Sequence, residues 1–357
     1  MILKTEILKF DPKNPKAVGI RKAAQVLKDG GLVAFPTETV YGLGADLLNT
    51  SALSRLYDIK KRPKDKPFTV AIADLRQLAA LDCEVSPYTF RFMSRFWPGP
   101  LTIILWTKKE EKLGIRMPDD NIALSLLKEL SIPVALPSAN ISGNPAPTTA
   151  EQVLKDLGGK IEMILDGGRT RIGIESTVLD LTISPYHVLR EGAIKGEEFK
   201  KVPKKSVLFV CTGNSCRSMM AEGLFKHLLK ERGRNDVEVI SAGIIGLNGS
   251  PPTGETIQVM DEAGVNVRGF KTKGINTDFI NRADLILGMQ EVHKREILAL
   301  VPQAEKRVHL LREFTKDEVT NDGFASEVPD PISKPSEVYK RVFEIIKRNL
   351  EKLVDMI

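Results

Sequence analysis

The chain has 357 residues, which exceeds the size at which one hydrophobic core normally keeps growing, so two domains are expected. Hydrophobic residues make up 42% and charged residues 27% of the chain, a balance that excludes disordered and fibrous proteins. No stretch is apolar enough to cross a bilayer, and Lys4, Glu6 and Lys9 interrupt the region where a signal peptide would be apolar. We therefore expect a cytoplasmic protein with no membrane partner.

The first half alternates short apolar runs with segments of helical periodicity, which predicts a mixed α/β fold. Strands are expected at residues 32–35, 69–72, 101–105, 134–136, 162–165 and 176–181, and helices at 20–28, 51–59 and 89–96. A polar run at residues 195–205 reads K-G-E-E-F-K-K-V-P-K-K. It predicts the boundary between a domain at residues 1–203 and a second at residues 204–357.

The second half opens with an apolar run at residues 206–210, a Gly-containing loop and a helical pattern at 219–232. Further strands are expected at 237–241 and 284–289, and further helices at 253–263 and 338–354. This order predicts a small doubly wound parallel sheet.

Positive charge is concentrated between Arg55 and Lys66, where six Lys and Arg residues face only Asp58 and Asp65, although the whole chain carries only +6. A solvated helix end and a site for a compact anionic ligand both remain open.

Seven polar turns rich in Gly and Pro lie near the expected strand ends of the first half, where ligands collect in open α/β sheets. They read PTETVYGLG (36–44), KKRPKDKP (60–67), WPGPLT (97–102), RMP (116–118), PSANISG (137–143), ESTV (175–178) and LREG (189–192). Together they supply cations for phosphates and hydroxyl and amide groups for a small polar ligand. No Walker A motif is present, so side chains and turns would hold any phosphate.

In order and wording these segments resemble the YrdC-like domain over about residues 3–202. The resemblance implies that L-threonine, bicarbonate and ATP give threonylcarbamoyl-adenylate and pyrophosphate, for the machinery that makes threonylcarbamoyladenosine in tRNA. Thr39 and Ser176 would contact threonine, and Tyr41 would shape the pocket. The residues implied in ATP binding are Lys60, Arg62, Lys66, Arg116, Ser138, Asn140 and Arg190. Mg²⁺ would bridge the phosphates, and direct tRNA binding is expected to be weak or absent.

Two features depart from the YrdC-like pattern. Many relatives continue into a second domain that closes over the active site, and nothing after Val202 resembles it. Some relatives also place a His in the strand after the K-x-R-P segment, where this chain has Ala71.

Cys211–Ser218 reads C-T-G-N-S-C-R-S and lies between an expected strand and an expected helix. Loop amides and the helix N-terminus would favour an anion there, and Arg217 can grip two phosphate oxygens. The same positive field favours the thiolate form of Cys211, which makes it a nucleophile. Ser218 can hydrogen-bond the sulfur, and Asn214 can pin the loop. A buried structural cysteine is the alternative reading, and Cys83 is expected to be an inert residue.

Phosphoryl transfer also needs an acid for the leaving group, and Asp330 lies in the Pro-fixed segment V-P-D-P-I-S-K-P. With S-A-G at 241–243 and A-D-L-I-L-G-M at 283–289, the second half resembles the low-molecular-weight protein tyrosine phosphatase family over about residues 205–357. The resemblance implies attack by Cys211 on phosphorylated protein side chains, protonation of the leaving group by Asp330 and hydrolysis of the cysteinyl-phosphate, without a cofactor. Ser215 and Cys216 would belong to the substrate loop, and Cys216 could form a reversible disulfide with Cys211.

Departures in this half bear on the substrate. Met219 stands where Pro is usual. Ser215 stands where eukaryotic tyrosine phosphatases carry an apolar residue, which resembles bacterial protein-arginine phosphatases. Ile332 and Ser333 stand where tyrosine-specific members place aromatic walls. These differences favour phosphoarginine over phosphotyrosine.

Alternative functions remain for both halves. The second could be an arsenate reductase, although no resolving cysteine follows Cys216, or a non-catalytic phosphoprotein reader. Retention of Cys211, Arg217 and Asp330 together argues against a reader. The first could be an RNA-binding module, for which a pI of 9.0 is weak support.

Overall fold

The computed structural model describes residues 3–130, 132–317 and 326–357, which form two compact units. The first unit comprises the chain up to Val85 and Thr89–Val202, and the second comprises Ser86–Tyr88 and Pro203–Ile357. Within the described ranges, no helix combines the length and the apolar character that a bilayer crossing needs.

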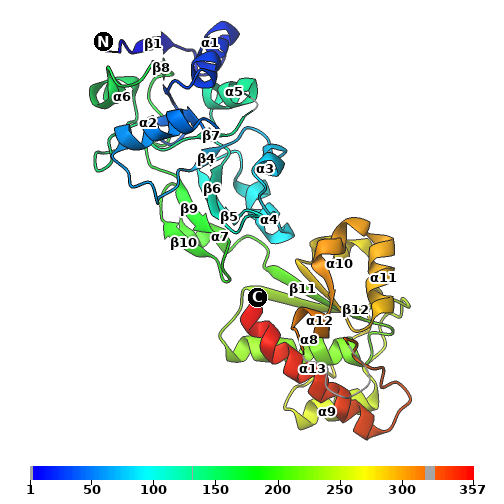
Figure 1. The fold of residues 1–357 in the computed structure, drawn as a ribbon. Helices are drawn as coiled ribbons and strands as arrows, with labels where there is room; N and C mark the ends of the chain where they lie inside the picture. The colour runs from blue at the N-terminus through cyan, green and yellow to red at the C-terminus, as the bar shows by residue number, and fades with distance from the viewer. Residues whose placement is uncertain (1–2, 131, 318–325) are drawn as a thin grey trace. The chain divides into compact units, whose positions relative to one another are not determined.

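The first unit is built on a ten-stranded sheet with the order β1-β8-β2-β3-β7-β4-β6-β5-β9-β10 (Figure 1). Its strands are β1 (Glu6–Lys9), β2 (Val33–Phe35), β3 (Gly42–Asp46), β4 (Val70–Ala71), β5 (Leu101–Trp106), β6 (Lys112–Arg116), β7 (Val134–Ala135), β8 (Met163–Asp166), β9 (Thr177–Asp180) and β10 (His187–Arg190). The sheet contains both parallel pairs, such as β1 with β8 and β5 with β9, and antiparallel pairs, such as β5 with β6. The expected mixed α/β class is confirmed.

Helices cover both faces of this sheet. They are α1 (Ala17–Lys28), α2 (Thr50–Lys60), α3 (Gln77–Ala80), α4 (Pro87–Phe96), α5 (Asn121–Leu130), α6 (Ala150–Leu157) and α7 (Gly196–Phe199). Because side chains alternate along a strand, Val33 and Phe35 pack with the buried residues of α1 and α5. Leu32 and Ala34 pack on the opposite face with α2 and α6. The sheet is therefore held rigidly from two sides.

The segment expected to separate the domains is structured at both ends. It contains α7, whose Phe199 is buried and lies 5.4 Å from the ring of Phe96 and 6.1 Å from that of Tyr186. Its last residue, Lys205, is the first residue of β11. The polar composition of the run does not reveal that Phe199 packs in an aromatic cluster of the first unit.

The second unit contains a four-stranded, fully parallel sheet with the order β12-β11-β13-β14. Its strands are β11 (Lys205–Cys211), β12 (Val237–Gly243), β13 (Leu285–Gly288) and β14 (Val308–Leu310). Its helices are α8 (Arg217–Glu231), α9 (Gly254–Glu262), α10 (Thr277–Arg282), α11 (Glu291–Leu300), the 3₁₀ helix η1 (Pro302–Arg307), α12 (Leu311–Phe314) and α13 (Ser336–Met356). The doubly wound parallel sheet expected from the sequence is confirmed.

The strand order of this sheet reverses at β11. Val207 and Phe209 pack with α8, α9 and α13, whereas Leu208 and Val210 pack with α10 and α11 on the other face. Ligands bind outside the carboxyl ends of the strands at such a reversal. The loop after β11 is therefore the expected site.

Candidate active sites

The first unit contains a cavity of about 510 Å³, bordered by the segments that follow β2, α2 and β7 and by those that precede β9. Residues from all seven polar turns line it. The predicted ligand residues on its wall are Lys60, Arg62, Arg116, Ser138, Asn140, Ser176 and Arg190. Cationic and hydroxyl side chains from segments more than 100 residues apart in the sequence therefore line the same cavity.

Lys60 ends α2 and is almost fully buried. Its ammonium donates to the backbone oxygens of Ser138 and Asn140, both at 2.6 Å, and to Asn140 Oδ1 at 3.0 Å. These three bonds use every donor of an ammonium group. Burial lowers the pKa of Lys60 to about 8, and the charge of Arg62 adds to this shift. In this geometry Lys60 fixes the loop after β7.

Arg190 lies at the end of β10 and holds the segment that leads into β9. Its Nη2 donates to Ser176 O at 2.9 Å and to Ser176 Oγ at 3.1 Å, and its Nη1 pairs with Glu175 at 3.0 Å. Ser176 Oγ also lies 2.9 Å from Thr102 Oγ1. A Cβ at Gly192 would lie 2.2 Å from Glu175 O, so glycine permits this close approach.

Arg116 forms a buried ion pair that the sequence analysis missed. Its Nη2 lies 2.8 Å from Glu38 Oε2, and both side chains are largely shielded from solvent. Its Nε donates to Gly99 O at 3.2 Å. Nearby, burial raises the pKa of Asp120, and the charge of Glu38 adds to this effect. The PTET turn thus contributes a carboxylate that orients Arg116 at the cavity wall.

Three predicted residues are not on the cavity lining. Thr39 is buried behind the wall, where its Oγ1 lies 2.9 Å from that of Thr37, a residue that does line the cavity. Tyr41 is also buried, its hydroxyl donates to Gly168 O at 2.7 Å, and burial raises its pKa. Lys66 is exposed, and its backbone oxygen accepts from Arg62 Nε at 3.0 Å.

In the second unit, the loop after β11 wraps around the sulfur of Cys211. Ser218 Oγ lies 2.9 Å from Cys211 Sγ, and the backbone N–H of Asn214 donates to the same sulfur at 3.2 Å. Asn214 adopts a left-handed φ of 55°, which turns this amide toward the sulfur. The arrangement thus directs one hydroxyl group and one backbone amide at the buried sulfur of Cys211.

A chain of hydrogen bonds behind the loop fixes these donors. Asn214 Nδ2 donates to Ser218 Oγ at 2.9 Å and to Ser241 Oγ at 2.8 Å. Ser241 in turn donates to Glu222 Oε2 at 2.5 Å. Because the Asn214 amide donates to Ser218, the Ser218 proton remains available for the sulfur.

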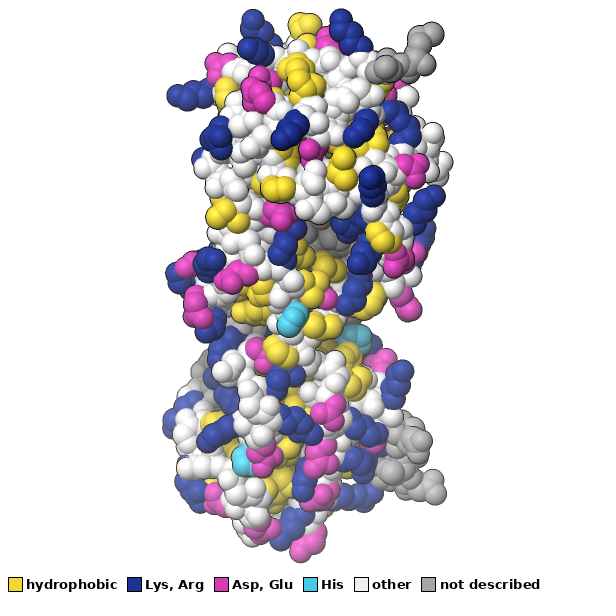
Figure 2. All heavy atoms as spheres, turned by 90° about the vertical axis from the view of Figure 1, so that its left-hand side faces the viewer, with side chains coloured by type: hydrophobic (Ala, Val, Ile, Leu, Met, Phe, Trp, Pro, Cys, Tyr) yellow, Lys and Arg dark blue, Asp and Glu magenta, His cyan; other side chains and the backbone are white. Residues whose placement is uncertain are grey.

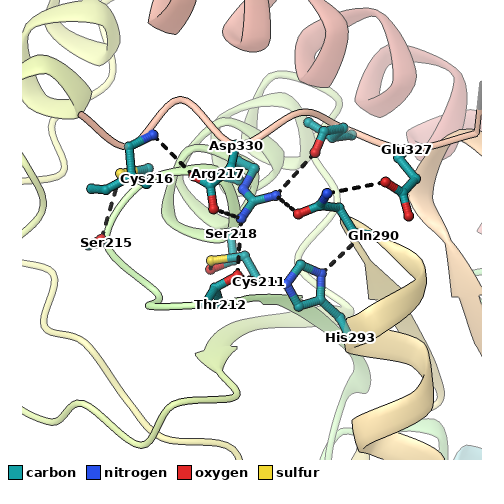
Figure 3. A network of polar contacts seen from close by, with 12 residues as sticks. Cys211, Thr212, Ser215, Cys216, Arg217, Ser218, Gln290, His293, Glu327 and Asp330 are labelled. Carbon is teal, nitrogen blue, oxygen red and sulfur yellow. Dashed lines mark hydrogen bonds and ion pairs between the residues drawn. The ribbon is translucent and has the colours of Figure 1, made fainter. Parts of the chain in front are cut away.

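Arg217 is buried and contacts the segment at residues 328–335 that carries Asp330, here called the acid loop. Its Nη1 donates to Gln290 Oε1 at 2.5 Å and to Val328 O at 3.1 Å, and its Nη2 pairs with Asp330 (Figure 3). Within the described part of the chain its Nε has no hydrogen-bond partner. The three predicted reacting groups, Cys211, Arg217 and Asp330, therefore lie together, with one donor left for a ligand.

The first turn of α11 contributes residues that the sequence analysis missed. Gln290 Nε2 donates to Glu327 Oε2 at 3.1 Å, and the backbone N–H of Gln290 donates to His293 Nδ1 at 2.9 Å. His293 Nε2 lies 3.1 Å from Thr212 Oγ1. Burial and the facing Arg217 lower the pKa of His293 to about 4. Thr212, His293 and Glu327 are far apart in the sequence, and only the fold brings them together.

The remaining predicted loop residues surround the mouth of the site. Cys216 is buried, with its sulfur 3.7 Å from the hydroxyl of Tyr339, and burial raises the pKa of Tyr339 to about 12. Ser215 is partly exposed. Ile332 is 48% exposed, and its backbone N–H donates to Asp330 Oδ1 at 3.1 Å. The acid loop thus presents an aliphatic side chain to solvent.

Both halves of the chain match known families. Residues 25–192 match the Sua5_yciO_yrdC model, described as telomere recombination. Residues 206–357 match the model described as low molecular weight phosphotyrosine protein phosphatase. The two resemblances seen in the sequence are confirmed.

Individual relatives support the first assignment. The threonylcarbamoyl-AMP synthase of Pyrococcus abyssi is 48% identical over 193 residues, which cover 51% of this chain and 56% of that protein. A putative threonylcarbamoyl-AMP synthase of Mycobacterium tuberculosis is 34% identical, over 54% of this chain and 94% of that protein. The crystal structure of P. abyssi Sua5 complexed with L-threonine aligns with a TM-score of 0.54 and 32% identity, covering 85% of this chain and 99% of that one. The chain spans little more than half the length of the first of these relatives.

Proposed function

Because this chain belongs to the threonylcarbamoyl-AMP synthase family and carries a low-molecular-weight phosphatase domain after it, we propose that it is a bifunctional enzyme. The first unit would form threonylcarbamoyl-AMP and pyrophosphate from L-threonine, bicarbonate and ATP. The product would pass to the machinery that modifies tRNA. The second unit would hydrolyse phosphorylated protein side chains.

The observation that carries the synthase proposal is the single cavity that Arg62, Arg116 and Arg190 share with the hydroxyl groups of Ser138 and Ser176. Adenylation requires the carbamate oxygen to attack the α-phosphorus while pyrophosphate leaves. The protein then has to position the reactants and balance phosphate charge, which cations on several walls can do. P. abyssi Sua5 forms a complex with L-threonine, which supports threonine as the amine substrate.

We propose roles for the ligand residues from this geometry. Arg62 and Arg190 would hold the phosphates, Ser176 would face threonine, and Lys60 would position Ser138 and Asn140. The described residues contain no cluster of three or more His, Cys, Asp or Glu placed to hold a metal. An Mg²⁺ ion would therefore take its oxygen ligands largely from the phosphates of ATP, as Mg²⁺ commonly does.

Direct tRNA binding is expected to be weak. Cationic and acidic side chains are interspersed on the face drawn in Figure 2, which gives a mixed field there. A filter-binding titration with tRNA between 50 and 200 mM salt, roughly the range over which phosphate contacts are lost, tests this expectation. Tight binding with a steep salt dependence would favour the RNA-binding alternative.

Arginine variants test the synthase proposal. Arg62→Ala and Arg190→Ala should each lower pyrophosphate release by about tenfold to a hundredfold, the size of one lost bond to a charged group. Arg55→Ala is the matched control, because Arg55 pairs with Glu162 outside the cavity lining. If all three variants behave alike, the cavity is not the nucleotide site.

For the second unit we propose attack by the Cys211 thiolate on phosphorus. A sulfur–phosphorus bond forms as the bond to the leaving group breaks, and Asp330 gives its proton to the leaving group. Water then attacks phosphorus, the sulfur–phosphorus bond breaks, and inorganic phosphate leaves. The grouping of Cys211, Arg217 and Asp330 supports this sequence of steps.

We also propose that phosphoarginine is the preferred substrate. Phosphotyrosine gains from aromatic walls, whereas the loops here offer Ser215, Ile332 and Ser333. Turnover of matched phosphoarginine and phosphotyrosine peptides decides between them. Binding of both peptides without release of phosphate would instead indicate a phosphoprotein reader.

A further inference from the structure

Thr212 is the residue that follows the nucleophile, and its hydroxyl oxygen is contacted from two sides. Arg217 Nη2 donates to Thr212 Oγ1 at 3.2 Å, and His293 Nε2 lies 3.1 Å from the same oxygen. In the described part of the chain these two groups are its only hydrogen-bond partners. The direction of the contact with His293 depends on which nitrogen of its ring carries the proton.

The tautomer of His293 follows from its other contact. The backbone N–H of Gln290 donates to Nδ1 at 2.9 Å, so Nδ1 has to offer a lone pair. His293 is fully buried, and its pKa is lowered to about 4, so the ring is neutral at physiological pH. A neutral imidazole carries one proton, which must then lie on Nε2. Nε2 therefore donates to Thr212.

Two donors consequently occupy both lone pairs of the Thr212 hydroxyl. A hydroxyl has two lone pairs and one proton, so this hydroxyl can act only as a donor to any third group. Thr212 is partly exposed, lies next to Cys211 in the chain, and contacts the guanidinium that faces the site (Figure 3). The nearby Arg217 Nε is also a donor without a partner among the described residues. Unused donors thus gather where an anion is expected.

We propose that Thr212 donates a hydrogen bond to the phosphoryl group in the second unit, at an oxygen that Arg217 Nη2 also holds. The inference rests on the proposed phosphatase function and adds Thr212 to its ligand-binding residues. His293 is then a positioning residue, because it sets the direction of the Thr212 proton without touching the substrate. The phosphoryl group takes the place of the Asp330 carboxylate at Nη2, which leaves that carboxyl group free to face the leaving group.

Binding of inorganic phosphate and of vanadate, by calorimetry and by competitive inhibition, tests the proposal. Thr212→Val keeps the shape of the side chain and removes the hydroxyl, so it should weaken both anions by about tenfold or more. Thr212→Ser restores the hydroxyl and should recover most of that loss. His293→Gln should weaken vanadate in the wild-type background and have little further effect when combined with Thr212→Val, because His293 acts through Thr212. Thermal unfolding of each variant shows whether it is folded.

A crystal structure of the full chain with phosphate bound separates a direct contact from an indirect one. The proposal expects Thr212 Oγ1 within about 3 Å of a phosphate oxygen. A separation beyond about 3.5 Å, or equal affinity of Thr212→Val and wild type, overturns the role of Thr212 while the phosphatase function stands. If wild-type protein binds neither anion and hydrolyses no phosphorylated peptide, the proposed function itself fails and the role of Thr212 falls with it.

Discussion

Replacing Lys60 by Met separates a lysine that positions a loop from one that binds phosphate. The ammonium spends its three donors on Ser138 and Asn140, so Lys60→Met should let the loop after β7 move. Ser138 and Asn140 both line the cavity, and a displacement of about 1 Å can cost about a hundredfold in rate. We therefore expect kcat/KM to fall for threonine and ATP together.

The same substitution has a calculable effect on stability. The pKa of Lys60 is lowered from 10.5 to about 8, so burial disfavours the ammonium by about 3 kcal/mol at neutral pH. Between pH 8 and 10.5 the unfolded chain keeps this proton while the folded chain has lost it. Wild-type stability should therefore rise with pH in this window, by about 2.5 kcal/mol between pH 7 and 10 relative to Lys60→Met.

Steady-state pyrophosphate release measures kcat/KM, and chemical unfolding at pH 7 and pH 10 measures the change in stability. Lys64→Met is the matched control, since Lys64 is an exposed lysine near the same turn. A rise in the KM for ATP alone, together with a stability difference that does not change with pH, would refute the positioning role. Lys60 would then contact the nucleotide directly, as the sequence alone led us to expect.

Further predictions concern the second unit and the connection. Cys211→Ser should abolish phosphatase turnover, and Asp330→Asn should slow a poor leaving group much more than p-nitrophenol. Ser215→Ile should lower turnover of phosphoarginine peptides while sparing or raising that of phosphotyrosine peptides. His293 faces Arg217, Asp330 and Glu327, and its pKa is lowered to about 4 in the folded chain. Below about pH 6.5 the unfolded chain binds a proton at this histidine that the folded chain does not. The stability of wild type should therefore fall relative to that of His293→Gln, by up to about 3 kcal/mol at pH 4. Cleavage between Val202 and Lys205 should release two folded, active fragments, and loss of either activity would show that the units depend on each other.

The fold class followed from the sequence because long patterned segments fix it. The apolar run before Cys211 and the periodic segments of α8 and α13 predict their elements within a few residues. β3 was missed because G-L-G-A-D carries two glycines, which strand patterns usually avoid. A Cβ at Gly42 would lie 2.5 Å from Leu136 Cδ1, so packing rather than strand propensity selects glycine there. β10 was missed because it has four residues and is largely exposed.

Some site residues could likewise be identified from the sequence, and others could not. Residues that carry a distinctive local pattern, such as Cys211 and Arg217, stand out in the sequence. Glu38 and His293 do not, because their roles depend on residues that are distant in the sequence. Glu38 pairs with Arg116, and His293 contacts Thr212, which lies 81 residues earlier in the chain. A lone buried histidine or a glutamate between two threonines has no periodicity to mark it. Only the tertiary contacts identify them.

The most direct test of the synthase assignment is the mass of the product formed from bicarbonate labelled with carbon-13. The Cys211→Ser chain, incubated with ATP, Mg²⁺, L-threonine and the labelled salt, should release pyrophosphate only when all components are present. The adenylate should be threonylcarbamoyl-AMP that carries the label. An unlabelled threonyl-adenylate, or pyrophosphate release that persists without threonine or bicarbonate, would contradict the assignment of the first unit.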